Sequence, residues 1–147
     1  MGYTVGWGGD VSEKGFSWKN GVAIIPDIKY EETSGTDKER LTGLSAREKE
    51  AILYSFEKPI KELEITPEIR QKDFDNYNTT DDHGMHIVGI AKDQNGNKFY
   101  KVKNSWDIDN PYNGYIYMSE AFIKFKMIDI IINKNVVPKD ISKKVGL

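Results

Sequence analysis

The order of apolar and polar positions changes along the chain, from short apolar runs between loops to longer, strand-like segments. Residues 3–7 are rich in β-forming side chains and are followed by two glycines, which predicts a short strand. Residues 22–25 form a second short apolar run, which Pro26 ends. We expect residues 10–20 to form a loop, and residues 33–37 (Thr-Ser-Gly-Thr-Asp) to form an exposed, mobile loop.

Two helices are predicted from the residues that begin them. Ser45 and Glu48 are spaced as a capping box, in which each side chain binds the backbone N–H of the other residue. This helix should end before Pro59 and turn three side chains toward the core: Ala51, Ile52 and Phe56. Thr66, followed by a proline suited to the first helical position, predicts a second short helix that runs to about Asn76.

From His83 onward the pattern is typical of strands. Residues 83–92 are largely apolar, and the Asn-Gly pair after them favours a tight hairpin with residues 99–103. The later predicted elements are a strand at 114–118, a helix capped by Ser119 and ending at Lys126, a strand at 127–132, and a polar tail from Pro138 with one helical turn. Helices and an antiparallel sheet segregated along the chain predict an α+β domain.

Composition limits the classes of function. A length of 147 residues predicts a single domain, residues 1–147, and 38% hydrophobic with 30% charged residues is typical of a soluble globular protein. The net charge of −2 gives no reason to expect nucleic acid or a membrane surface as a partner. The first residues lack the apolar segment of a signal peptide, and no apolar run is long enough to cross a bilayer. We therefore expect a cytoplasmic protein.

The residues able to do chemistry are few. There is no cysteine, hence no thiol nucleophile, and the two histidines are His83 and His86, beside Asp81 and Asp82. These four side chains invite a hypothesis of metal-dependent hydrolysis. However, zinc needs three or four converging ligands, and residues three apart in a strand point to opposite faces. We therefore expect no metal and no cofactor, and a structural or surface role for His86.

His83 is distinguished by the residues downstream of it. A hairpin that begins at His83 leads back to Asn104, Ser105 and Trp106. An imidazole base needs its other ring nitrogen held by a partner, and an asparagine oxygen can do this without adding charge. An indole over that contact would exclude water and strengthen it.

These segments resemble the histidine and asparagine motifs of papain-like cysteine peptidases. The motifs are Asp82-His83-Gly84, Asn104-Ser105-Trp106 and Asn113-Gly114-Tyr115. Matches at residues 6–16, 115–119 and 133–138 resemble the bleomycin hydrolase or aminopeptidase C branch, in family order along almost the whole chain.

The resemblance implies an antiparallel sheet, or half-barrel, with a few short helices. It also implies that His83 is the catalytic base, that Asn104 orients its ring, that Trp106 shields the contact, and that Asp82 supports the site. The family's cysteine and glutamine would lie on a missing N-terminal segment, which makes this chain a C-terminal portion that acts on peptide substrates and is inactive alone. Cutting such an enzyme at its cleft would expose apolar surface, so we expect a homo-oligomer.

Three departures from the family pattern leave details open. Asp107 stands where a glycine usually follows Asn-Ser-Trp, and Gly84 replaces the usual alanine and would widen the pocket beside the histidine. The end of the chain, residues 143–147, does not show the extended arm that gives some members aminopeptidase character. A non-catalytic interaction module that retains the fold is the alternative function.

Overall fold

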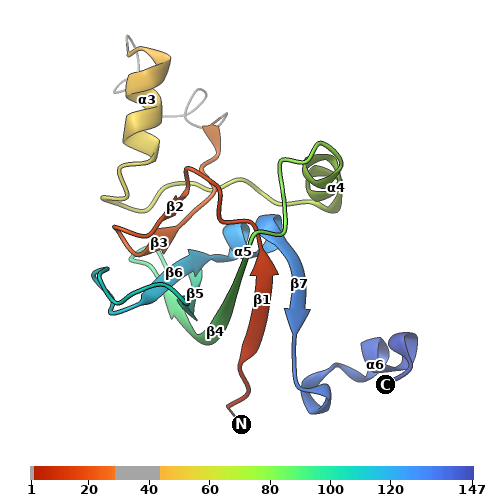
Figure 1. The fold of residues 1–147 in the computed structure, drawn as a ribbon. Coiled ribbons are helices and arrows are strands. Elements are labelled where there is room, and N and C mark those ends of the chain that lie inside the picture. The colour runs from red at the N-terminus through yellow and green to blue at the C-terminus, as the bar shows by residue number, and fades with distance from the viewer. Residues whose placement is uncertain (1, 29–43) are drawn as a thin grey trace.

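The computed structural model describes residues 2–28 and 44–147, so the loop expected at residues 33–37 lies outside the described part. A curled seven-stranded sheet has the order β2-β3-β6-β5-β4-β1-β7 (Figure 1). The strands are β1 (Val5–Gly9), β2 (Phe16–Ser17), β3 (Val22–Ala23), β4 (His83–Lys92), β5 (Lys98–Lys103), β6 (Tyr115–Ser119) and β7 (Met127–Ile131). The helices are α3 (Ala46–Leu53), α4 (Pro67–Asp75), α5 (Glu120–Lys126) and α6 (Lys139–Val145), with a 3-10 turn at Lys134–Val136. The predicted α+β class is confirmed.

The sheet is antiparallel in all but one of its strand pairs. The exception is β3, which runs parallel to β6 with Val22 opposite Tyr117. Parallel neighbours need a long crossover connection, and here most of the chain lies between the two strands. The predicted antiparallel sheet is therefore a mixed one at this position.

The predicted elements after His83 agree closely with the structure. The strand expected at residues 83–92 has those bounds, and its hairpin partner β5 begins one residue earlier than expected. Ser119 caps α5, since its hydroxyl accepts a hydrogen bond from the backbone N–H of Phe122. The tail from Pro138 forms the two turns of α6, which is more helix than the single turn expected, and the 3-10 turn lies just before it. Residues 10–20 are mostly loop, but they also contain β2.

Helix α3 begins with the predicted capping box but does not face the core as expected. The Ser45 N–H donates to Glu48 Oε2 over 2.8 Å, and the Glu48 N–H donates to Ser45 Oγ over 3.3 Å. Ala51 and Ile52 are exposed, however, and Leu53 is the buried residue of this helix. The expectation was wrong because α3 stands away from the sheet (Figure 1), so most of its surface faces solvent. Amphipathic spacing alone does not supply a packing partner.

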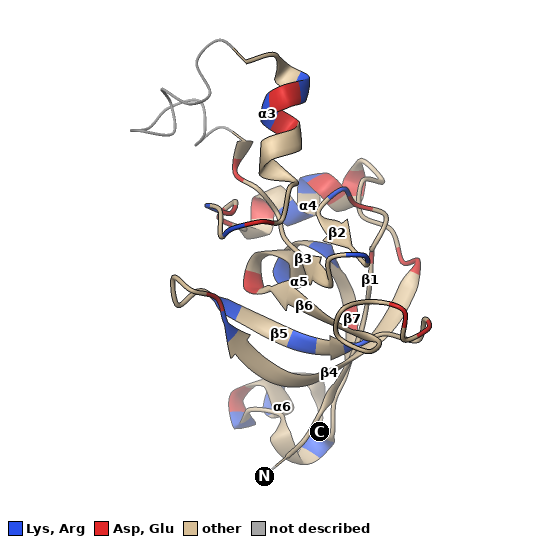
Figure 2. Cartoon of the chain, turned by 90° about the vertical axis from the view of Figure 1, so that its left-hand side faces the viewer, with Lys and Arg blue, Asp and Glu red and all other residues tan. Residues whose placement is uncertain are grey.

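The hydrophobic core lies where α5 packs on the sheet. Its fully buried side chains come from β1, β5, β6 and α5: Trp7, Val102, Ile116, Met118 and Phe122. Charged residues lie outside this core; Figure 2 shows both signs on α3 and α4, and lysines along β5. Two of these lysines, Lys101 and Lys103, place their Nζ atoms 4.4 and 5.0 Å from the centre of the Tyr115 ring. No helix in residues 2–28 and 44–147 has the length and apolar character required to span a membrane.

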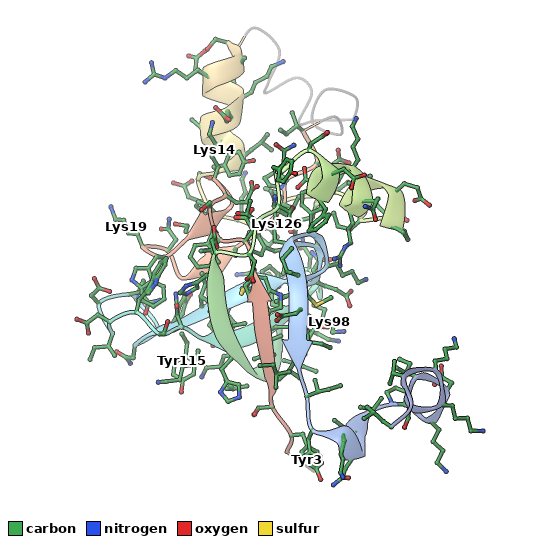
Figure 3. The ribbon with its side chains drawn as sticks, turned by 45° about the vertical axis from the view of Figure 1, so that its right-hand side comes forward. Tyr3, Lys14, Lys19, Lys98, Tyr115 and Lys126 are labelled. Atoms are coloured by element: carbon green, nitrogen blue, oxygen red, sulfur yellow. The ribbon has the colours of Figure 1, made fainter. Side chains whose placement is uncertain are left out.

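Lys126 is the exception to this separation of core and charge. Its side chain is 1% exposed, and Figure 3 shows it inside the molecule, near the end of the sheet away from Tyr3. Its Nζ lies 2.5 Å from Glu13 Oε1 and 3.0 Å from Asp73 Oδ2, and it donates to the Asn78 carbonyl over 2.8 Å. The lysine therefore joins the N-terminal loop, α4 and the segment that leads into β4.

Candidate active site

His83 and Asn104 are brought together by the β4–β5 hairpin. His83 is the first residue of β4, and Asn104 directly follows the last residue of β5. Antiparallel pairing brings the start of one strand beside the end of the other, and His86 lies opposite Lys103. Two residues that are 21 positions apart thus become neighbours in space.

The contact between the two side chains is a short hydrogen bond, 2.6 Å from His83 Nε2 to Asn104 Oδ1. The same Oδ1 accepts the backbone N–H of Ser105 over 2.7 Å, which identifies this atom as the oxygen of the amide. Because a carbonyl oxygen only accepts, Nε2 of His83 must carry a proton. In the neutral ring the lone pair then lies on Nδ1, which has no hydrogen-bond partner among the described residues.

Asn104 is buried, with 4% of its surface exposed. Its Oδ1 receives both hydrogen bonds, while its Nδ2 has no partner in the part of the chain that the structure describes. The amide orientation is thus set by its oxygen end. An amide held in this way can fix the ring of His83 in one orientation and one tautomer.

The indole of Trp106 lies next to the ring of His83. The centres of the His83 and Trp106 rings are 5.0 Å apart, at an interplanar angle of 44°. Phe16 and Trp18 pack edge-on against the indole, at centroid distances of 5.7 and 5.4 Å. Trp18 is itself fixed by a 2.8 Å hydrogen bond from its Nε1 to Asp109 Oδ1.

Sequence reasoning missed Phe16 and Trp18 as parts of this aromatic cluster. They lie in residues 10–20, which we interpreted as a loop, and Phe16 is in fact a residue of β2. Aromatic residues at alternating positions were the available signal, because alternation is typical of a strand. Their contact with Trp106 spans about 90 positions, so no local pattern could predict it.

Asp82 supports the loop beside the site and does not contact the imidazole ring. Its Oδ1 accepts the N–H of Val11 over 3.0 Å, and its Oδ2 accepts the hydroxyl of Ser12 over 2.6 Å. Its own N–H donates to the Gly9 carbonyl. The residue that precedes the histidine is therefore tied to the N-terminal segment.

His86 lies on the other face of β4. Met85 is buried and His86 is exposed, in the alternating pattern of the strand, and His86 Nε2 lies 2.6 Å from the hydroxyl of Thr4. Among residues 2–28 and 44–147, no group of three His, Cys, Asp or Glu side chains is arranged to hold a metal ion. His83, His86, Asp81 and Asp82 thus do not form such a group.

A cavity of about 520 Å³ opens beside the histidine. Both histidines line it, together with Asp81, Asn104 and three glycines of β1 and β4: Gly6, Gly8 and Gly84. A Cβ atom at Gly84 would meet nothing within 4 Å, so the glycine leaves open space where the family's alanine would carry a methyl group.

Comparisons with known proteins assign the family. Residues 34–146 match the Peptidase C1-like family. Aminopeptidase C of Lactobacillus helveticus is 31% identical over 62 residues, which are 42% of this chain and 14% of that protein. Aminopeptidase G of Lactobacillus delbrueckii subsp. lactis is 29% identical over 58 residues, 40% of this chain and 13% of that protein. The chain therefore belongs to the Peptidase C1-like family.

A solved structure supports the fold. PepW of Lactobacillus rhamnosis HN001 superposes with a TM-score of 0.56 over 96% of this chain at 18% sequence identity. The match covers 26% of the PepW chain. The chain thus corresponds to a minor part of each of these longer proteins. Within this family, the chain is a papain-like peptidase segment that contains no cysteine.

Proposed function

We propose that this chain provides the general base and its orienting amide for peptide-bond hydrolysis by a cysteine on a polypeptide segment outside this chain. The observation that supports the proposal is the 2.6 Å contact from His83 Nε2 to Asn104 Oδ1, with Oδ1 identified by the Ser105 N–H. It leaves Nδ1 as the basic nitrogen. Lacking cysteine, the chain should have no turnover alone.

The proposed reaction uses Nδ1 of His83 twice. Nδ1 takes the proton of the cysteine thiol, and the thiolate attacks the carbonyl carbon of the peptide bond. The imidazolium then returns the proton to the leaving amine as the C–N bond breaks, which leaves a thioester. In the second half Nδ1 takes a proton from water, whose oxygen attacks the thioester carbon. The C–S bond then breaks, the acid is released, and the imidazolium returns its proton to the sulfur, which restores the thiol.

The supporting residues hold the histidine in place during these steps. Asn104 keeps the Nε2–H tautomer, so that the same nitrogen accepts and returns protons. In this proposal Trp106 shields that contact, and Phe16 and Trp18, which pack on its indole, hold it in place. A covered hydrogen bond is stronger because less water competes for it. Asp82 supports the site indirectly, because its carboxylate ties the segment before His83 to residues 11 and 12.

The tautomer can be tested on the chain alone. Long-range ¹H–¹⁵N NMR of the imidazole rings at high pH should show His83 as the Nε2–H tautomer. His86 is the internal control, because its hydroxyl partner Thr4 can donate or accept and so imposes no tautomer. In Asn104→Ala the preference of His83 should be lost. A neutral His83 protonated on Nδ1 in the unmodified chain would contradict the proposal.

The catalytic role needs the missing segment. Aminoacyl and peptide fluorogenic substrates should give no turnover with this chain, and turnover should appear when a cysteine-bearing family segment is added in trans. In the assembled form, His83→Ala should lower kcat about 10³-fold or more. Asn104→Ala should lower it less, and Asn95→Ala, at the exposed hairpin turn, serves as its matched control.

Two results would overturn the catalytic role. Activity of the purified chain by itself would mean that another nucleophile operates. An assembled complex that binds peptide but stays inactive, with a reactive thiol present, would identify the chain as a non-catalytic module. The second outcome corresponds to the alternative function considered from the sequence.

The homo-oligomer stays a prediction. β7 is an edge strand of the sheet, and its Ile130 and Ile131 are 46% and 76% exposed. An exposed apolar edge strand is a surface on which another chain can pair. Sedimentation velocity should show a species larger than a monomer, and Ile131→Lys should shift it toward the monomer. A single monomer peak at high concentration would contradict the prediction.

A further inference from the structure

The most unusual charged group away from His83 is the carboxylate of Glu62, which is part-buried and has no cation beside it in the described part of the chain. Its Oε2 accepts the N–H of Ile25 over 2.7 Å and the hydroxyl of Ser119 over 2.5 Å. Its Oε1 has no hydrogen-bond partner, and no ion pair reaches Glu62 within the described residues. A buried charge normally has an ionic partner, because leaving water is costly for it.

Glu62 lines a cavity of about 450 Å³, which is within the size range of small-molecule sites. Phe99 and Tyr117, from the central strands of the sheet, form one wall. Phe56 and Pro59, from the segment after α3, form another. The cavity thus combines aromatic walls with the part-buried carboxylate of Glu62.

Two features of the backbone help to build these walls. Gly21 has φ +65°, and a Cβ there would lie 2.3 Å from the ring of Tyr112. The glycine lets Tyr112 pack at 5.0 Å, edge to face, on Tyr117. Phe56 has φ +59°, a left-handed conformation that is unfavourable for a bulky side chain. Such conformations persist where the surroundings hold them, often at ligand-binding sites.

We propose that this cavity binds a small organic cation, a primary ammonium group on an apolar or aromatic body, with Glu62 Oε1 as its ionic partner. The other charged residues of the lining cancel, since Glu57 and Asp93 are matched by Lys58 and Lys92. Glu62 therefore sets the sign of the ligand. Aromatic faces also attract an ammonium group through cation–π contacts.

This site is separate from the proposed catalytic half-site and does not depend on it. The cavity includes Lys92, at the end of β4, whereas His83 begins that strand. At 3.3 Å per residue, the two ends of β4 are about 30 Å apart. The cavity therefore needs its own ligand and its own test.

The test uses the full chain and two probes of equal shape. Titration of 2-phenylethylamine, followed by NMR, should give saturable shifts at Phe99 and Tyr117, while the neutral 2-phenylethanol should bind at least ten times more weakly. Glu62→Gln should remove this discrimination. Glu64→Gln is the matched control, since Glu64 is an exposed carboxylate on the same segment.

A second variant keeps the test valid if Glu62→Gln disturbs folding. Phe56→Ala removes part of the aromatic wall and leaves both hydrogen bonds of Glu62 Oε2 untouched. It should weaken phenylethylamine binding several-fold. The proposal is overturned if the unmodified chain shows no saturable binding, if the amine and the alcohol bind equally, or if Phe56→Ala binds like the unmodified chain.

Discussion

The two ends of α5 each lie beside a charged group that is at least partly withdrawn from water, but the two groups are in opposite situations. At its start, the capping Ser119 donates to Glu62, an anion with no cation beside it in the described part of the chain. At its end, Lys126 is a cation with Glu13, Asp73 and, at 4.0 Å, Asp10 around it. Lys126 thus has partners of opposite charge, whereas Glu62 has none among the described residues.

The difference also appears in the direction of the pKa shifts. Burial raises the pKa of Glu62, and the hydrogen bonds from Ser119 and Ile25 oppose this only in part. Burial alone would lower the pKa of Lys126, but the hydrogen bonds to Glu13 and Asp73 outweigh it and raise the pKa. A charge stabilised by its own chain has a structural role. The surroundings of Glu62 disfavour its charged form, which the proposed ammonium ligand would stabilise.

The largest expected effect comes from removing the paired lysine. Lys126→Ala leaves the buried Asp10 and the part-buried Asp73 without their cation, and it should lower the free energy of unfolding by about 3–5 kcal/mol. The measurement is denaturation by urea. Lys124→Ala, an exposed lysine of the same helix, should cost less than about 1 kcal/mol. Equal losses in the two variants would mean that the Lys126 cluster is not structural.

A smaller effect is expected where β1 approaches the end of α5. A Cβ at Gly9 would lie 2.2 Å from the Lys126 carbonyl and 2.6 Å from the Trp7 ring. Gly9→Ala should therefore destabilise the fold by about 1–3 kcal/mol. Gly84→Ala, in open space, should change it by less than about 0.5 kcal/mol. A reversed order would contradict the packing described for this end.

The pH dependence of stability should have opposite signs at the two ends. Protonated Glu62 favours the folded state, so its contribution is full below about pH 4.3 and is lost as the pH rises through the raised pKa. Burial would raise the pKa of Asp73, but the hydrogen bonds from Thr79 and Lys126 lower it. Its contribution is therefore present above about pH 3.9 and is lost as the pH falls through the lowered pKa.

These signs can be measured as unfolding free energies across the acid range. Glu62→Gln should flatten the loss of stability with rising pH, and Asp73→Asn should flatten the loss with falling pH. Profiles parallel to that of the unmodified chain would show that neither group titrates as described. The test separates the two ends of α5 without any ligand.

Much of the proposed half-site could be predicted because its contacts are local or follow from one hairpin. Strand β4 and the Asn-Gly turn are encoded in consecutive residues, and the turn determines which ends meet. Once His83 and Asn104 stand at those ends, their proximity follows. The opposite orientation of His86 likewise follows from the two-residue repeat of a strand.

The sequence alone thus determined the caps of α3, α4 and α5, the hairpin, and the meeting of His83 with Asn104. Tertiary structure decided the aromatic cover of Trp106, the parallel pairing of β3 with β6, the burial of Lys126, and the cavity at Glu62. The physical reason is separation along the chain. A cap or a turn depends on neighbouring residues, whereas a buried charge depends on groups that only the packed fold brings together.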